Sequence, residues 1–458
     1  MAAVQGIEPA GIESASQYPP TRQALLACSL LFLGYTLAFV DRNIVSLLVV
    51  PIEHDLGLDD VQMGLLQGTA FAVFYSVFGL PIAWAIDRFA RRAILTAGIG
   101  VWSLMTCLTG LSRGFVPFFL ARVGVGAGEA TILPGATSLL ADYFRPAARG
   151  RALGVFASGI YIGAATALIG GGAILHRLHG RSVVLPVLGT LQPWQLVLVA
   201  AGSLGIPLAA ATLLLREPPR RHARAAAGAP RRAPGLRELF RDHPRAIGAH
   251  FVGFTAMAFA SYGATAWLPT LFIREYAWTP GTVGVRLGMI ALFAGPLGSY
   301  AGGHLADMLE KAGRRDGKFL VGALAAACTC VPAVLLGLSQ HAASTFAAAT
   351  AVVFSTSLVW GVAPAALQEI VHGAVLARAT AIYTALLNLI ALGLGPPSVA
   401  LLGQMLGHGN RGLGLAMAIV VPAACIVALL AFAASRPAYR RARAGLASLH
   451  AEPRGVDA

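Results

Sequence analysis

Twelve segments of predominantly apolar residues follow one another along this chain of 458 residues. An α-helix rises 1.5 Å per residue, so about 20 apolar residues cross the hydrocarbon core of a bilayer, which is about 30 Å thick. Soluble domains do not repeat such runs. The sequence therefore predicts an all-α membrane protein with twelve transmembrane helices, at residues 22–50, 62–86, 93–112, 116–140, 152–175, 194–215, 246–273, 281–307, 319–338, 342–371, 377–405 and 412–435.

The composition excludes several classes of function. Charged residues make up only 12% of the chain, whereas about a quarter of the residues are charged in soluble domains. The formal charge of +14 does not indicate a nucleic-acid partner, because the basic residues stand in short groups between apolar runs. The five cysteines lie inside apolar segments without suitable neighbours, and no catalytic motif is present. We therefore expect no metal, no other cofactor and no enzymatic activity.

The positions of arginine and lysine predict the topology. Most of the 34 basic residues fall in alternate loops, while the intervening loops hold only Arg113, Arg177, Arg181, Arg274 and Arg411. Loops rich in basic residues stay in the cytoplasm, so both termini are expected there. The predicted organisation is a disordered tail (1–20), an N-terminal six-helix half (21–215), a basic linker (216–245), a C-terminal six-helix half (246–435) and a basic tail (436–458).

A repeated pattern indicates two related halves. AWAIDRFARR (83–92) ends the second predicted helix and GHLADMLEKAGRR (303–315) ends the eighth, so both halves place an acid before a pair of arginines. Charged residues at these and neighbouring helix ends could form a cytoplasmic gate of ion pairs, or the arginines could only mark the cytoplasmic side. The candidates are Asp87, Arg91, Arg92, Asp142, Arg149, Asp307 and Arg315.

Three charged side chains lie deep inside predicted helices: Asp41 in the first, and Arg122 and Glu129 in the fourth. A charge at the bilayer centre costs on the order of 3 kcal/mol, so each should face a partner or a water-filled cavity. Arg122 and Glu129 are seven residues apart and share one helix face. The glycines between them permit close approach of a helix or a substrate. The alternative is a buried ion pair that only fixes helix packing.

Further polar and aromatic residues are candidates for substrate binding. Arg42, next to Asp41, would meet either an anionic headgroup in a cavity or a structural acid. Asn388 precedes the sequence GLGPP, where the eleventh helix should be kinked or loosened. Aromatic side chains could also line a site, although in membrane helices they more often serve packing or the interfacial belt. They are Tyr75, Trp267, Trp360 and Tyr383.

The sequence resembles the major facilitator superfamily over essentially its whole length. AIDRFARR is similar to the family's loop between helices two and three, usually written G-x-x-x-D-R-x-G-R-R, with Ala83 and Ala90 where glycine is usual. LREPPRR resembles the Glu-containing motif after helix six. A narrower resemblance, to the spinster family of lysolipid and sphingolipid transporters, rests on FVDRNIVSLLVVPIEHDLGLDDVQMGLLQG, ARVGVGAGEATILPGATSLLADYF, LARATAIYTALLN and GLGPPSVALLG.

The resemblance implies the major facilitator fold, in which two six-helix halves rock about a central cavity beside helices one and four. It also implies that Asp41, Arg122 and Glu129 form a proton-coupling network, with the proton as coupling ion. Arg122 would switch between the two carboxylates, or to an anionic substrate, so that proton binding depends on conformation.

We therefore expect a proton-coupled secondary transporter that works by alternating access in a bacterial inner membrane. Its expected cargo is a lysophospholipid or related amphipathic anion, and it is expected to act as a monomer among membrane lipids. Glucuronate and aromatic-acid symporters also carry Asp-Arg in helix one, so an organic-acid:proton symporter is an alternative. A non-transporting receptor or sensor of the same fold is another.

Overall fold

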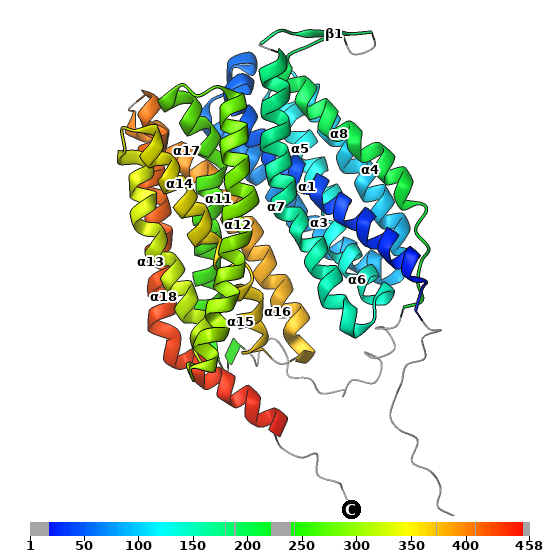
Figure 1. The fold of residues 1–458 in the computed structure, drawn as a ribbon, viewed down its shortest axis with the longest axis vertical. Helices are drawn as coiled ribbons and strands as arrows, with labels where there is room; N and C mark the ends of the chain where they lie inside the picture. Colours follow the sequence, from blue (N-terminus) through cyan, green and yellow to red (C-terminus); the bar gives the residue numbers. More distant parts are fainter. Residues whose placement is uncertain are drawn as a thin grey trace, which may run out of the picture.

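A computed structural model shows the chain as a bundle of long helices (Figure 1). It describes residues 18–451 apart from 179, 187–188, 221–239, 242, 372 and 408. Twelve helical segments are long and apolar enough to cross a membrane, which confirms the prediction of an all-α protein with twelve spans. The predicted tail 1–20 lies outside the described residues except for its last three, and the predicted linker 216–245 lies largely outside them.

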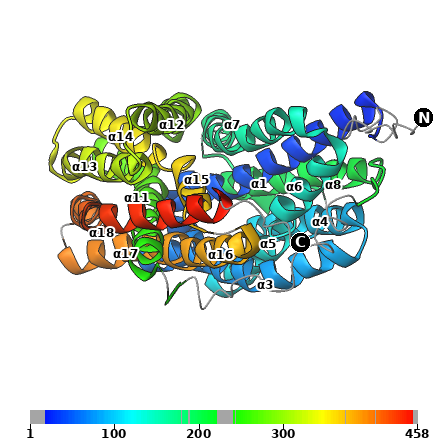
Figure 2. The ribbon, with the colours of Figure 1, turned by 90° about the horizontal axis from the view of Figure 1, so that it is seen from below.

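The helices form two halves that lie beside each other (Figures 1 and 2). The N half comprises α1 (Thr21–Leu56), α2 (Asp60–Gln67), α3 (Thr69–Arg88), α4 (Arg91–Gly110), α5 (Phe115–Glu129), α6 (Ile132–Tyr143), α7 (Pro146–Leu178) and α8 (Pro193–Thr212). The C half comprises α11 (Pro244–Tyr276), α12 (Pro280–Lys311), α13 (Gly317–Leu338), α14 (Ala342–Ser357), α15 (Val362–Gln368), α16 (Gly373–Leu386), the π-helical turn η2 (Leu387–Leu392), α17 (Gly393–Leu406), the 3₁₀ turn η3 (Gly409–Arg411) and α18 (Gly412–Ala451).

The two faces of the bundle are easily told apart. α1 begins and α18 ends at the bottom of Figure 1, and we call this the terminal side. A short antiparallel hairpin of β1 (Val183–Leu185) and β2 (Gly189–Leu191) stands at the top, and we call this the hairpin side. The sequence reading did not predict this hairpin, which connects α7 to α8.

The eleventh span departs from regular α-helix near its two adjacent prolines. Pro396 and Pro397 have no N–H, so the carbonyls of Leu392 and Gly393 lose their α-helical partners. The helix passes through η2 just before these residues, which confirms the loosening predicted ahead of GLGPP. Thr69 Oγ1, from the N half, donates a hydrogen bond to the carbonyl O of Gly393 at 2.6 Å. A carbonyl freed by proline is thus used to join the two halves.

Glycines permit the closest contacts between the halves. At Gly68, where α2 meets α3, a Cβ atom would lie 2.5 Å from the carbonyl O of Leu392. At Gly284, on α12, a Cβ atom would lie 2.2 Å from the carbonyl O of Leu168 on α7. Either clash would push the halves apart. The two crossings lie in the half of the bundle nearer the hairpin side, so the halves are pressed together there.

The last helix is longer than the sequence predicted. The basic tail was expected to begin at residue 436, but α18 runs unbroken to Ala451. Arg436 Nε donates to Asp316 Oδ2 at 2.6 Å, and the Tyr439 ring stacks on Phe319 with 4.2 Å between centroids. Arg443 pairs with Glu310. These contacts with the C half hold the helix together beyond the point where its apolar run ends.

Candidate functional site

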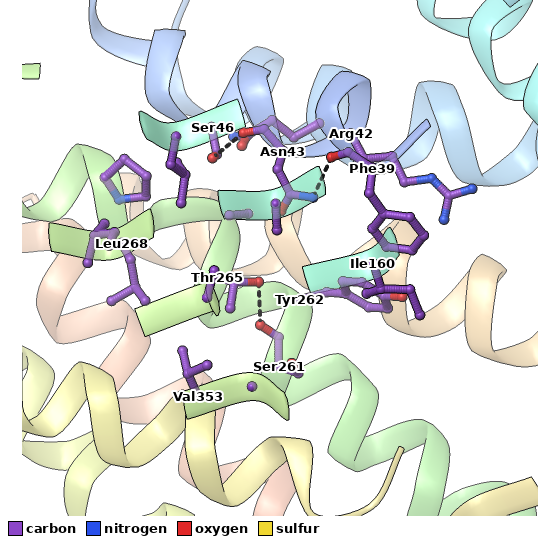
Figure 3. A pocket seen from close by; sticks show the side chains of 18 of the residues that line it. Phe39, Arg42, Asn43, Ser46, Ile160, Ser261, Tyr262, Thr265, Leu268 and Val353 are labelled. Atoms are coloured by element: carbon purple, nitrogen blue, oxygen red, sulfur yellow. Dashed lines mark hydrogen bonds between the residues drawn. The ribbon is translucent and has the colours of Figure 1, made fainter. Parts of the chain in front are cut away.

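A cavity of about 320 Å³ lies between the two halves. In Figure 3, Phe39, Asn43 and Ser46 on α1 face Ser261 and Thr265 on α11 across this space. The wall also includes residues of α7, α12 and α14. Both halves therefore contribute to one central site, at the depth where the spans cross the middle of the bundle.

The two walls of the cavity differ in chemistry. The charged groups, Arg42 and Arg122, belong to the N half. Much of the facing C-half wall is apolar, with Leu268, Leu287 and Ile290 among its members. Several polar side chains on the wall are already bonded to main-chain carbonyls: Asn43 Nδ2 to Phe39 O at 2.8 Å, Ser46 Oγ to Asn43 O at 2.7 Å and Thr265 Oγ1 to Ser261 O at 2.8 Å. The arginines are thus the dominant polar feature of the wall.

Arg42 is ion-paired with Glu129. Its Nε lies 2.8 Å from Glu129 Oε2, and the Glu129 side chain is completely buried. The Arg42 guanidinium also lies over three aromatic rings, with its Cζ 4.5 Å from the ring centroid of Phe71, 4.9 Å from Phe39 and 5.0 Å from Tyr75. Ring faces attract cations, and more strongly where water is excluded. Arg42 was predicted to meet either an anionic headgroup or a structural acid. In the described conformation its partner is an acid, Glu129.

Asp41 and Arg122 lie next to each other, but their side chains do not form an ion pair. The Asp41 carboxylate accepts a hydrogen bond from Thr106 Oγ1 of α4 at 3.1 Å. Arg122 is 2% exposed and forms no ion pair within 4.0 Å of any described carboxylate. It donates instead to the main-chain O of Asp41 and of Leu66, both at 3.4 Å. In this conformation Arg42, not Arg122, pairs with Glu129. The switching of Arg122 between the two carboxylates or to an anionic substrate stays a prediction.

Glycine packing explains how α5 presents these side chains. A Cβ atom at Gly126 would lie 2.6 Å from the carbonyl O of Phe71, so α3 and α5 approach at backbone distance. This contact brings Phe71 beneath both guanidinium groups, 5.6 Å from Arg122 Cζ in addition to its contact with Arg42. The close approach predicted for the glycines between Arg122 and Glu129 is confirmed for neighbouring helices.

Three of the predicted substrate-binding residues do not lie on the cavity wall. Trp267 is fully buried, and its Nε1 donates to Pro396 O at 2.9 Å within the C half. Tyr383 packs against His250, with 5.0 Å between ring centroids. Asn388 is buried in η2 and does not line the cavity. These placements for the described conformation correct the prediction, because helix rotation turns the three side chains into the C half.

The remaining predicted aromatics take different positions. Tyr75 does not line the cavity but lies under Arg42. Trp360 lines the cavity wall and packs edge-on against Tyr262, with 5.8 Å between ring centroids. Tyr75 therefore contacts Arg42, which lines the cavity, whereas Trp360 and Tyr262 line the cavity themselves and can contact a substrate directly.

Four of the seven predicted gate residues make contacts inside the N half, and two of them, Arg91 and Asp142, form a buried brace there. Arg91 is 1% exposed; its Nη1 lies 2.5 Å from Asp142 Oδ2 and its Nε 2.7 Å from Glu217 Oε1. Arg92 Nη1 donates to Leu215 O at 3.0 Å, and Arg149 Nη2 to Ala141 O at 2.8 Å. We call Arg91, Asp142 and Glu217 the N-half brace. A second group is exposed and forms no ion pair with any described residue, namely Asp87, Asp307 and Arg315.

Comparison with known proteins identifies the family. A family model described as Major Facilitator Superfamily matches residues 31–396. The chain belongs to the major facilitator superfamily. It is 29% identical over 426 residues to an MFS-type efflux pump of Mycolicibacterium smegmatis, covering 92% of this chain and 94% of the relative. A probable L-galactonate transporter of Escherichia coli is 27% identical over 375 residues, covering 78% of this chain and 77% of the relative.

A solved structure shares the fold over almost the whole chain. It is a bacterial homolog of the human lysosomal transporter spinster in an inward-facing, unoccupied conformation, with a TM-score of 0.75 and 23% identity. The match covers 94% of this chain and 99% of that protein. The superfamily membership indicates a transporter, and the chain shares the fold of this structure.

Among described residues, the ion pairs that join the two halves of this transporter lie on the hairpin side. The Arg274 guanidinium, at the end of α11, contacts the Glu53 carboxylate of α1. It also donates to both carboxylate oxygens of Asp60 on α2, at 2.8 and 3.1 Å. We call Arg274, Glu53 and Asp60 the hairpin-side latch. The sequence did not predict this latch, because Arg274 was considered only as one of the basic residues that indicate the membrane topology.

Gln67 is a further cavity residue that the sequence reading missed. It lies at the end of α2, lines the cavity, and its Nε2 is buried with no described hydrogen-bond partner. A polar amide inside an apolar span, next to Gly68, was the available signal. It was overlooked because only formally charged residues were treated as costly inside the membrane.

Proposed function

We propose that this transporter couples a proton to the movement of an amphipathic anion across the membrane by alternating access. The observation that carries the proposal is the central cavity, which places two arginines on one wall, one of them ion-paired with the buried Glu129, and aliphatic side chains on the other. An anionic headgroup suits the first wall, and an acyl chain suits the second. A lysophospholipid is the simplest molecule with both parts.

Proton coupling is supported by the buried acids. Glu129 is completely buried, and its Oε1 has no described hydrogen-bond partner. Asp41 is also buried and accepts a bond from a neutral hydroxyl. A carboxylate in such surroundings depends on its nearest cation, so any movement of Arg42 away from Glu129 favours proton uptake. An anionic cargo in the cavity adds a negative charge beside this cluster, which also favours the protonated acid.

Transport by reconstituted protein tests the proposal directly. We expect the purified chain in liposomes to accumulate a radiolabelled lysophospholipid when a pH gradient is imposed, and to lose accumulation when a protonophore collapses the gradient. L-galactonate and an uncharged monoacylglycerol serve as comparison cargoes. Lysophospholipid transport that ignores the gradient would contradict proton coupling. Transport of galactonate without the lysophospholipid would contradict the amphipathic cargo.

A smaller organic acid is the second candidate cargo. The likeness to a probable L-galactonate transporter over 78% of the chain favours it, as do the hydroxyl groups on the wall. A sugar acid, however, is polar on every side and would leave Leu268, Leu287 and Ile290 facing hydroxyl groups. Apolar atoms on one wall therefore favour the amphipathic cargo.

Alternating access is supported by the position of the hairpin-side latch. Opening the cavity toward the hairpin side must separate Arg274 from Glu53 and Asp60, because these residues belong to different halves. Arg274→Gln leaves two neighbouring carboxylates without their shared cation in the closed arrangement. We expect the population open to the hairpin side to rise by on the order of tenfold.

Thiol labelling measures this shift. Ser46→Cys places a reporter on the cavity wall of a chain whose native cysteines have been replaced, and an impermeant thiol reagent is added on the hairpin side. Arg274→Gln should accelerate labelling. Arg286→Gln is the matched control. Arg286 is exposed, and its Cζ lies 4.3 Å from the ring centroid of Trp278 in the same half, so its replacement breaks no contact between the halves. Equal labelling rates in the two variants would show that the latch does not hold the halves together.

We also propose that the terminal side faces the cytoplasm of a bacterial inner membrane and that the chain works as a monomer with membrane lipids around it. The excess of arginine and lysine in the loops on the terminal side supports this orientation. A reporter enzyme that is active only in the cytoplasm, fused to the C-terminus, should be active. An inactive fusion would reverse the orientation.

A further inference from the structure

We propose that Arg122 and Gln67 form an oxyanion subsite in the cavity, separate from the Arg42–Glu129 pair, that binds the phosphate or carboxylate of the cargo. This inference rests on the proposed function and deepens it, because it assigns the charged end of the cargo to specific residues. It divides the two arginines between two tasks. Arg42 serves the titrating acid, and Arg122 serves the anion.

Arg122 is a buried cation whose charge no described carboxylate balances directly. The residue is 2% exposed, yet it lines the cavity and makes no ion pair within 4.0 Å. Its hydrogen bonds, from Nε to Leu66 O and from Nη1 to Asp41 O, are both long at 3.4 Å. A guanidinium has five N–H donors, and its Nη2 donates to no described group. A buried cation with unused donors is a binding site for an anion.

Gln67 adds an unused neutral donor beside this cation. The side chain is 8% exposed and lines the same cavity, and no described group accepts from its Nε2. The two residues are neighbours, because Arg122 bonds to the carbonyl of Leu66, the residue before Gln67. Leaving a buried N–H donor without a partner is unfavourable, so the site is incomplete without an acceptor. An oxyanion offers several acceptor oxygens to both donors at once.

Charge balance connects the subsite to the proton. Arg42 and Arg122 carry two positive charges, and ionised Asp41 and Glu129 carry two negative ones, so the buried cluster is neutral as a whole. A bound anion with one negative charge unbalances it, and a proton on Asp41 or Glu129 restores neutrality. Anion and proton therefore favour each other's binding, which is a coupling free energy between two sites.

The position of Gln67 also connects the subsite to the movement of the halves. Gln67 is the last residue of α2 and precedes Gly68, whose backbone faces Leu392 O of the C half. Thr69, two residues on, makes the hydrogen bond to Gly393 O. A ligand bound at Gln67 is thus held next to the crossing that must separate when the hairpin side opens.

Binding to the purified full-length chain in detergent tests the subsite. The probes share one acyl chain: lauroyl lysophosphatidic acid carries a phosphate, laurate a carboxylate, and monolaurin neither. We expect the wild-type chain to bind an anionic probe more tightly than monolaurin. The anion that binds more tightly shows whether the subsite prefers a phosphate or a carboxylate. Gln67→Glu keeps the shape of the side chain but turns a carboxylate toward the anion. It should weaken anion binding by roughly tenfold or more and leave monolaurin binding unchanged.

Two further variants make the outcome decisive. Gln67→Met removes the amide without adding charge and should weaken anion binding several-fold; it also replaces Gln67→Glu if that variant does not fold. Thr350→Val is the matched control, since its hydroxyl is already bonded to Phe346 O at 2.8 Å and the residue does not line the cavity, and it should leave all affinities unchanged. An anion preference that persists in Gln67→Glu and Gln67→Met would overturn the subsite.

The experiment also separates failure of the subsite from failure of the proposed cargo. If the wild-type chain binds none of the three amphiphiles, the amphipathic cargo is rejected, and the same variants are then measured with L-galactonate. Loss of galactonate binding in Gln67→Glu, but not in Thr350→Val, would support the subsite with a different cargo. Unchanged galactonate binding in both variants would reject the subsite as well.

Discussion

Replacing Glu129 with glutamine is expected to abolish gradient-driven accumulation of the cargo while cargo exchange continues. Glutamine keeps the shape of the side chain but can neither titrate nor neutralise Arg42, which lies 2.8 Å away. The cavity and its apolar wall remain, so the cargo can still bind and cross. Asp41 is bonded to Thr106 and not to Arg42, so we do not expect it to replace Glu129 in coupling, and accumulation should fall to that of protein-free liposomes.

Two assays on the same proteoliposomes check this result. Uptake under a pH gradient should be lost, and exchange of external labelled cargo for internal unlabelled cargo should persist. Glu275→Gln is the matched control, because Glu275 is a half-buried carboxyl on α11 that does not line the cavity. It should behave as the wild type. If Glu129→Gln and Asp41→Asn both accumulate cargo normally, proton coupling through this cluster is ruled out.

Much of the fold was readable from the sequence because the bilayer imposes simple rules. Apolar length alone located the spans, and the GLGPP sequence located the irregular turn at η2. Features set by contacts between distant segments were not readable. The extension of α18 to Ala451 depends on partners such as Asp316, more than a hundred residues away in the sequence. The same is true of the hairpin-side latch.

The site was predictable in its members but not in its pairing. The cost of burying charge singled out Asp41, Arg122 and Glu129, and all three side chains are buried. Which arginine meets Glu129 depends on helix rotation and on the packing of Gly126 against α3, neither of which leaves a periodic pattern. Two of the aromatic candidates, Trp267 and Tyr383, were misplaced for the same reason. Trp267 looked like a cavity residue, but its N–H donates to the main-chain O of Pro396 inside the C half.

Replacing Arg91 with methionine is expected to destabilise the protein by about 3–5 kcal/mol. Arg91 is 1% exposed and at the centre of the N-half brace, where Asp142 and Glu217 share its guanidinium. Its Nη2 also donates to Pro218 O at 2.9 Å, which ties the start of the linker to α4. Methionine fills similar space but leaves the buried Asp142 carboxylate beside an apolar chain. The thermal midpoint of the purified protein in detergent should fall by on the order of 10 °C.

Arg88→Met provides the matched control for this loss. Arg88 lies three residues earlier and is exposed, with its Cζ 4.6 Å from the ring centroid of Trp84. Its replacement changes the net charge by the same amount but breaks no buried ion pair. Adding Asp142→Leu to Arg91→Met should recover part of the stability, because the carboxylate that has lost Arg91 is replaced by an apolar side chain. Equal midpoints for Arg91→Met and Arg88→Met would mean that the brace adds no stability. A double variant less stable than Arg91→Met would instead show that Asp142 is held by contacts other than Arg91.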